Sequence, residues 1–185
     1  MNPVFRASIA AVAVAFWSCG DPTRINARFE VVSDTITVSA LSGSSIGART
    51  ALNTLRHEAV RAEPGSNFDV VFDITSSGQA VLYPAQAISS LGRAGIQRST
   101  QHLDSILVAP PEGYSEAMTP TPISVGDVLV IRAIQAACRP PELNPYIFSK
   151  LQITAIDTVA RTVTFVMRVD PNCGFRSFRD GIPTL

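Results

Sequence analysis

Hydrophobic and polar residues alternate along much of the chain, and a period of two residues is typical of half-buried β-strands. In residues 68–74 four apolar side chains fall on one face. Asp69 and Asp73 fall on the other face, where we expect both carboxylates to lie in solvent. Small residues at 75–78 predict a turn, and residues 79–83 supply the partner strand of a hairpin.

A second hairpin is predicted near the end of the chain. Residues 150–156 and 162–169 alternate in the same way on either side of a turn at 157–161. Together with the first hairpin and the shorter alternating runs, they predict eight or nine strands. These shorter runs cover residues 28–33, 35–40, 95–99, 103–109 and 127–134.

One segment follows a different period. Residues 48–63 are rich in Ala, Leu, Arg and Glu and predict a single short helix. Because strands and helices do not otherwise alternate, parallel doubly wound folds are disfavoured. We therefore expect an all-β chain, an antiparallel β-sandwich or partly open barrel, with one β-rich domain over residues 28–185. The residues at helical intervals are Ala48, Leu52, Leu55 and Ala59.

The start of the chain predicts a secretion signal. Arg6 and the amino terminus precede an uncharged apolar stretch over residues 7–17. Such a stretch rises about 16 Å as a helix, roughly half of a hydrocarbon core, which is too short for a durable transmembrane helix. We expect residues 1–18 to be a signal peptide and residues 19–27 to be the new N-terminus and its tether.

The end of this leader reads Phe16-Trp17-Ser18-Cys19 and resembles the lipobox of bacterial lipoproteins. The resemblance implies that Cys19 becomes the lipidated N-terminus, and that Gly20 beside it directs the protein to the outer membrane, facing the periplasm or the exterior. The family usually has Leu at the position of Phe16 and a small residue at that of Trp17. Ordinary cleavage after Gly20 is the alternative, and it would leave a secreted or periplasmic protein without Cys19.

The cysteine count is consistent with export. Of three cysteines, the lipobox takes one and leaves Cys138 and Cys173, an even remainder that predicts a disulfide in an oxidising compartment. A metal or redox pair is the alternative. It has little support, because the chain has no CxxC motif and no histidine near either thiol.

Composition narrows the function classes further. Fifteen basic and fifteen acidic residues leave a net charge of zero, so no long-range field attracts a nucleic acid, and we expect none to bind. A hydrophobic content of 46% predicts a packed core. Phosphate-binding, haem-attachment and metal-ligating motifs do not occur, so we expect neither a cofactor nor a metal.

One motif suggests catalysis. Residues 43–47 read GSSIG and fit the G-x-S-x-G nucleophile elbow, which would make Ser45 the nucleophile of a small serine hydrolase with His57 or His102 as its base. The elbow requires a strand before it and a helix after it. A flexible connection of turn-forming residues is the simpler interpretation.

The C-terminal tail suggests binding instead. Phe175, Arg176, Phe178 and Arg179 interleave rings with guanidinium groups and would form a patch for a carbohydrate or a peptide if the rings were exposed. Alternatively, the rings complete the core. We expect an exported, lipid-anchored envelope protein whose β-domain is non-catalytic and has a binding or structural role. The anchor would then be its only contact with the membrane.

Overall fold

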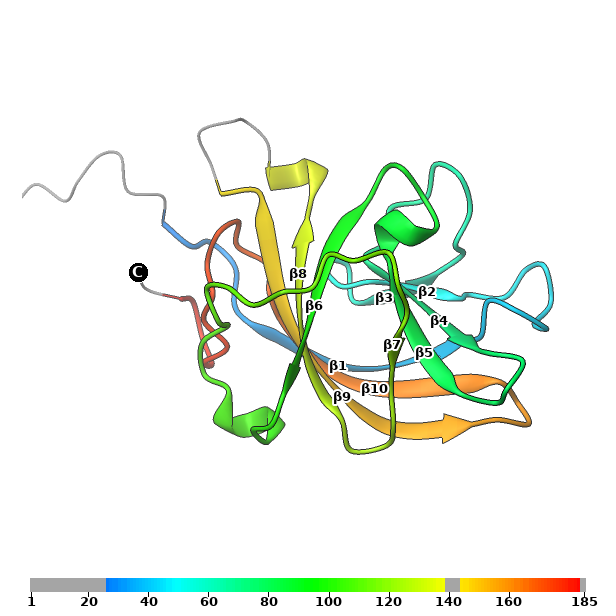
Figure 1. Ribbon diagram of the computed structural model, residues 1–185. Coiled ribbons are helices and arrows are strands. Elements are labelled where there is room, and N and C mark those ends of the chain that lie inside the picture. The colour runs from blue at the N-terminus through cyan, green and yellow to red at the C-terminus, as the bar shows by residue number, and fades with distance from the viewer. Residues whose placement is uncertain (1–25, 139–143, 184–185) are drawn as a thin grey trace, which may run out of the picture.

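The chain folds into two antiparallel β-sheets packed face to face. The computed structural model describes residues 26–138 and 144–183, so Cys19 and the predicted leader lie outside the described residues. Sheet A has the strand order β1-β10-β9-β8-β6 and sheet B the order β3-β2-β4-β5-β7 (Figure 1). Over the described ranges the two ladders stay separate. The all-β prediction is therefore confirmed, as a sandwich rather than a barrel.

The described part of the chain contains ten strands and three short 3-10 helices, so the expected count of eight or nine strands is slightly low. Within those residues, none of the helices combines the length and the apolarity needed to cross a bilayer. In chain order the elements are β1 (Val32–Ser39), β2 (Ala51–Asn53), β3 (Glu58–Val60), β4 (Val70–Ile74), β5 (Ala80–Pro84), η1 (Ala85–Ala87), β6 (Arg93–Ser99), η2 (Leu103–Ser105), β7 (Thr121–Pro122), β8 (Val128–Ile134), η3 (Ala136–Cys138), β9 (Tyr146–Asp157) and β10 (Thr162–Asp170).

The helix predicted over residues 48–63 is wrong. The segment forms the β2–β3 hairpin instead. All three residues of β2 are buried, and the strand pairs with β3 along one edge and with β4 along the other. Pairing on two sides satisfies the backbone of β2 and overrides the helical propensity of its residues. His57 closes the hairpin in the left-handed region, at φ 53°.

Two further strand predictions are corrected. Residues 28–33 and 35–40 do not form separate strands, because β1 runs through Asp34, whose exposed carboxylate accepts the Thr35 N–H at 2.7 Å. Residues 103–109 are not a strand. Residues 103–105 form η2 and a loop follows. The buried side chains Leu103, Ile106 and Ala109 are three residues apart, whereas a strand would bury every second residue.

The core lies between the sheets, and sheet A is also buried on much of its outer face. In β8, Leu129 and Ile131 point into the sandwich, whereas Val128 and Val130 point outward beneath the segment that contains η2. The tail covers the same face through Phe178. This double burial explains why β8 reads as a continuous apolar run.

The predicted disulfide is confirmed. Cys138 at the end of η3 is bonded to Cys173 just after β10, with their Cα atoms 5.4 Å apart. The bond joins the end of β8 to the beginning of the C-terminal tail, so it fixes the tail against sheet A. Cys138 is fully buried.

The double variant Cys138→Ser/Cys173→Ser should unfold more easily than the wild type. The bond closes a separation of 35 residues, and its loss should lower the free energy of unfolding by about 4 kcal/mol through the entropy of the unfolded chain. Urea unfolding followed by circular dichroism measures the difference. Reducing agent should lower the wild-type midpoint and leave the variant's midpoint unchanged. A wild-type midpoint that does not respond to reduction would contradict this prediction.

Candidate functional site

The GSSIG segment is a turn between β1 and β2 and not a nucleophile elbow. Ser45 is exposed, and its carbonyl accepts the Ala48 N–H at 2.9 Å. A strand follows it where the elbow requires a helix, so the predicted structural context of Ser45 is wrong. The two histidines lie in other turns: His57 lies between β2 and β3, and His102 is exposed before η2.

The first glycine of that segment has a structural role. Gly43 lies at φ 72°, and a Cβ there would come within 2.9 Å of Arg161 Nε. Arg161 donates from Nε to the Ser42 carbonyl at 2.8 Å and from Nη2 to the Ile74 carbonyl at 2.9 Å. Arg161 thus ties this turn to β4.

Asp73 belongs to the same contact, and the expectation that it lies in solvent is wrong. Its Oδ1 accepts the Ser42 N–H at 2.9 Å and its Oδ2 accepts the Ser42 hydroxyl at 2.8 Å. Arg161 Nη2 lies 3.7 Å from Oδ1. The carboxylate is buried among these donors and holds the turn in place.

The rings of the tail do not form an exposed aromatic patch. Phe175 is 5% exposed and Phe178 is 1% exposed, so of the two interpretations the one in which the rings complete the core is confirmed. Arg176 donates from Nη1 to the Ala109 carbonyl at 3.2 Å, and Arg179 is exposed. Of the four predicted residues, only the arginines are available at the surface.

Asp69 is a buried carboxylate, contrary to the expectation that it lies in solvent. Its Oδ2 accepts the Thr54 N–H at 2.7 Å and the Thr54 hydroxyl at 2.6 Å, and its Oδ1 accepts Gln135 Nε2 at 2.7 Å. Burial raises the pKa of Asp69 to about 6, although the hydrogen bonds from Thr54 oppose the rise. The alternating pattern could not indicate this burial, because it assumes that the outer face of sheet B is wet.

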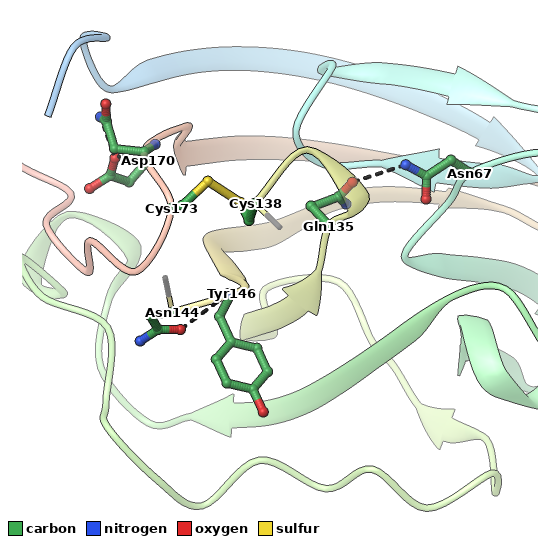
Figure 2. The surroundings of a disulfide bond; sticks show 8 residues. Asn67, Gln135, Cys138, Asn144, Tyr146, Asp170 and Cys173 are labelled. Atoms are coloured by element: carbon green, nitrogen blue, oxygen red, sulfur yellow. Dashed lines mark hydrogen bonds between the residues drawn. A yellow bond between two sulfur atoms is a disulfide. The ribbon is translucent and has the colours of Figure 1, made fainter. Parts of the chain in front are cut away.

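A chain of polar contacts leads from Asp69 to the disulfide. Gln135 Oε1 accepts a hydrogen bond from Asn67 Nδ2 at 2.9 Å (Figure 2). The Gln135 carbonyl accepts the Cys138 N–H at 3.0 Å. Asn67 and Asp69 precede β4 in sheet B, whereas Gln135 follows β8 in sheet A. The chain therefore connects the two sheets at the end of the sandwich that carries the disulfide.

A cluster that sequence reasoning missed lies on the outer face of sheet A. The Arg132 guanidinium carbon lies 4.8 Å from the ring centre of Tyr114 and 4.6 Å from that of Tyr146. Glu116 Oε1 accepts Arg132 Nη2 at 2.6 Å. Gly95 makes the arrangement possible, because a Cβ there would lie 2.7 Å from the Cβ of Tyr114. We call Tyr114, Glu116, Arg132 and Tyr146 the tyrosine–arginine cluster.

The tyrosine–arginine cluster places the Arg132 guanidinium group 4.8 and 4.6 Å from the centres of two rings, with part of its side chain exposed. Such a group presents fixed donors to a carboxylate or a phosphate. Its residues come from three separate segments, so no local motif indicated it. Over residues 26–138 and 144–183, no three His, Cys, Asp or Glu side chains converge to form a metal site.

Comparison with known proteins does not assign the chain to a family. No family model matches it, and neither the curated proteins nor the solved structures yield a match. The fold and its cross-link define the class of the described domain as a disulfide-bonded antiparallel β-sandwich.

Asp69 should make the stability of the domain depend on pH. Its pKa is raised in the folded state, so the folded protein holds the proton more tightly than the unfolded chain does. The contribution of Asp69 to stability is fully present below about pH 4 and is lost as the pH rises through about 6. The loss amounts to about 3 kcal/mol.

The Asp69→Asn variant isolates this effect. An amide at position 69 can still accept from Thr54, and flips of the Gln135 and Asn67 amides keep their hydrogen bonds paired. The free energy of unfolding is measured with urea at several pH values. That of Asp69→Asn should fall less than that of the wild type as the pH rises from 4 to 7, because the variant has no carboxyl group at position 69. Parallel wild-type and Asp69→Asn curves between pH 4 and 7 would contradict the assignment.

Proposed function

We propose that the protein is an exported bacterial lipoprotein, anchored through Cys19, whose β-sandwich is a binding or structural domain of the cell envelope. The observation that carries the proposal is the disulfide between Cys138, which is buried, and Cys173, which is partly buried. Structural disulfides form and persist in exported proteins and are rare in a reducing cytosol. Export is also what the apolar leader before Cys19 implies.

The cysteines divide into two uses that fit this proposal. Of the three cysteines in the sequence, Cys138 and Cys173 form the cross-link, which leaves Cys19 for modification. A lipid on Cys19 would contribute about 0.8 kcal/mol for each CH2 group buried in the bilayer, so two or three acyl chains would anchor the protein stably.

Metabolic labelling with palmitate tests the anchor. The wild type should incorporate label and partition into the detergent phase, whereas Cys19→Ser should do neither. The matched control is Cys138→Ser/Cys173→Ser, which removes two cysteines from the domain and should keep the label. Equal labelling of wild type and Cys19→Ser, or no label on either, would refute lipidation at this position. Mass spectrometry of the mature N-terminus distinguishes cleavage before Cys19 from cleavage after Gly20.

The tyrosine–arginine cluster favours a second candidate function, the binding of a carboxylate-bearing envelope ligand. Glu116 is half exposed, and an exposed ion pair contributes at most about 1 kcal/mol, so a carboxylate of the ligand can replace it. Contact with the rings of Tyr114 and Tyr146 restricts the motion of the Arg132 guanidinium group, which reduces the entropy lost on binding. Insoluble cell-wall glycopeptide supplies carboxylates of this kind.

Co-sedimentation with purified cell-wall glycopeptide tests this second function. The wild type should pellet with the polymer, and Arg132→Gln should bind about tenfold more weakly, because hydrogen bonds between charged groups are lost. Arg98→Gln removes an arginine of another ion pair, with Asp127, and should bind as the wild type does. Wild-type protein that stays in the supernatant, or Arg132→Gln that pellets equally, would exclude this ligand class.

A further inference from the structure

The N-terminal segment is fixed to the C-terminal tail. The Arg28 and Phe29 N–H groups donate to Asn172 Oδ1 at 2.7 and 3.0 Å, and Asn172 Nδ2 donates to the Phe29 carbonyl at 2.8 Å. The Val31 N–H also donates to the Gly181 carbonyl at 3.2 Å. The chain therefore enters the domain beside the tail, at the same end as the disulfide (Figure 1).

The length of the tether limits where this end can lie. Seven residue steps separate Cys19 from Asn26, the first described residue. At 3.3–3.6 Å a residue they reach about 25 Å at most. If Cys19 carries the lipid, Asn26 must lie within about that distance of the membrane surface. The turn between β9 and β10 lies at the far end of these two strands from the tethered end of the domain (Figure 1).

The surface at the tethered end combines exposed apolar side chains with arginines. Phe29 is 61% exposed and Ile182 is 54% exposed. Val108 pairs with Ser177 of the tail, and together with Ile182 it lines a hollow of about 410 Å³. We call this surface the tail face; its residues are Arg28, Phe29, Leu107, Val108, Arg176, Arg179 and Ile182.

The charges of the tail face suit a phospholipid headgroup. Arg28 and Arg179 are exposed, and Arg176 lines the hollow. The neighbouring Asp180 is paired with Arg168, which leaves Glu30 as the acidic side chain next to Arg28 and Phe29. Arginines beside exposed apolar side chains are typical of surfaces that lie in a membrane interface, where the rings and aliphatic groups enter and the guanidinium groups meet phosphates.

We propose that the tail face lies against the membrane that holds the lipid, with Phe29 and Ile182 in the headgroup region and the arginines on lipid phosphates. The inference rests on the proposed lipid anchor and adds an orientation to it: the tethered end of the domain lies on the bilayer and the β9–β10 turn points away from it. The tail face would then be a second contact with the membrane, in place of the expectation that the anchor is the only one. A tether that reaches about 25 Å at most keeps the tail face at a high effective concentration near the bilayer, so weak individual contacts are sufficient.

The fluorescence of a single introduced tryptophan can report this orientation. The chain has one tryptophan, Trp17, which lies in the leader and is removed before Cys19 becomes the N-terminus. A tryptophan placed by substitution is then the only indole of the mature protein. Phe29→Trp and Ile182→Trp place it on the tail face. Val159→Trp is the matched control, because Val159 is 94% exposed in the β9–β10 turn.

The experiment uses the full-length mature protein as it is purified from the producing cells, mixed with vesicles of zwitterionic and anionic phospholipid with brominated acyl chains. The indoles of Phe29→Trp and Ile182→Trp should be quenched at least about twofold more than that of Val159→Trp, because bromine quenches only an indole that reaches the interface. Flotation of the vesicles measures anchoring separately from orientation.

The two proposals fail in distinguishable ways. If none of the variants floats with the vesicles, the lipid anchor is refuted, and the orientation with it. If all three float but their indoles are equally quenched, or none is quenched, the anchor stands and the orientation of the tail face is refuted. Thermal unfolding of the three variants within a few degrees of the wild type excludes misfolding as the cause.

Discussion

Burial of sheet A on both faces is the constraint on which the arrangement of the chain ends depends. A sandwich needs only the inner face of each sheet, yet the outer face of β8 and β9 carries Val130 and Phe148, which water would otherwise contact. The segment with η2 and the C-terminal tail cover them. Lys150 closes this layer: its buried ammonium donates to the Leu103 and Ile106 carbonyls at 2.6 and 3.0 Å. Burial lowers the pKa of Lys150, and the nearby Arg168 lowers it further.

The alternating pattern predicts those strands whose burial is one-sided or whose partner follows directly in sequence. The β4–β5 and β9–β10 hairpins were predictable because a short turn fixes their register. The predicted helix over residues 48–63 fails because β2 pairs with a strand along each edge and its residues are fully buried. Both features depend on tertiary structure and have no local signature in the sequence. The disulfide was predictable from the count of cysteines and the leader alone.

The candidate sites were less predictable than the fold, because each is assembled across the sequence. Asp69 was expected on a solvent-exposed face of its strand. Its hydrogen-bond partner Gln135 lies 66 residues away in the sequence, so no local pattern indicated the contact. From the sequence, the rings of Phe175 and Phe178 could belong to a surface patch or to the core. The choice between the two depends on whether the tail covers sheet A, which the sequence does not show. Arg132 was indicated by nothing more than one charged residue in an apolar strand.

The contacts that join the two ends of the chain also determine how a load on the N-terminal segment would spread through the domain. Force applied at Arg28 first reaches the hydrogen bonds of Asn172, and Cys173, the next residue, is bonded to Cys138 at the end of β8. From there the Gln135–Asp69 contact continues into sheet B. In parallel, β1 pairs with β10 along eight residues, so the edge strand resists along its whole length. If Cys19 carries a lipid, as we propose, a pull on it would be shared between both sheets through these contacts.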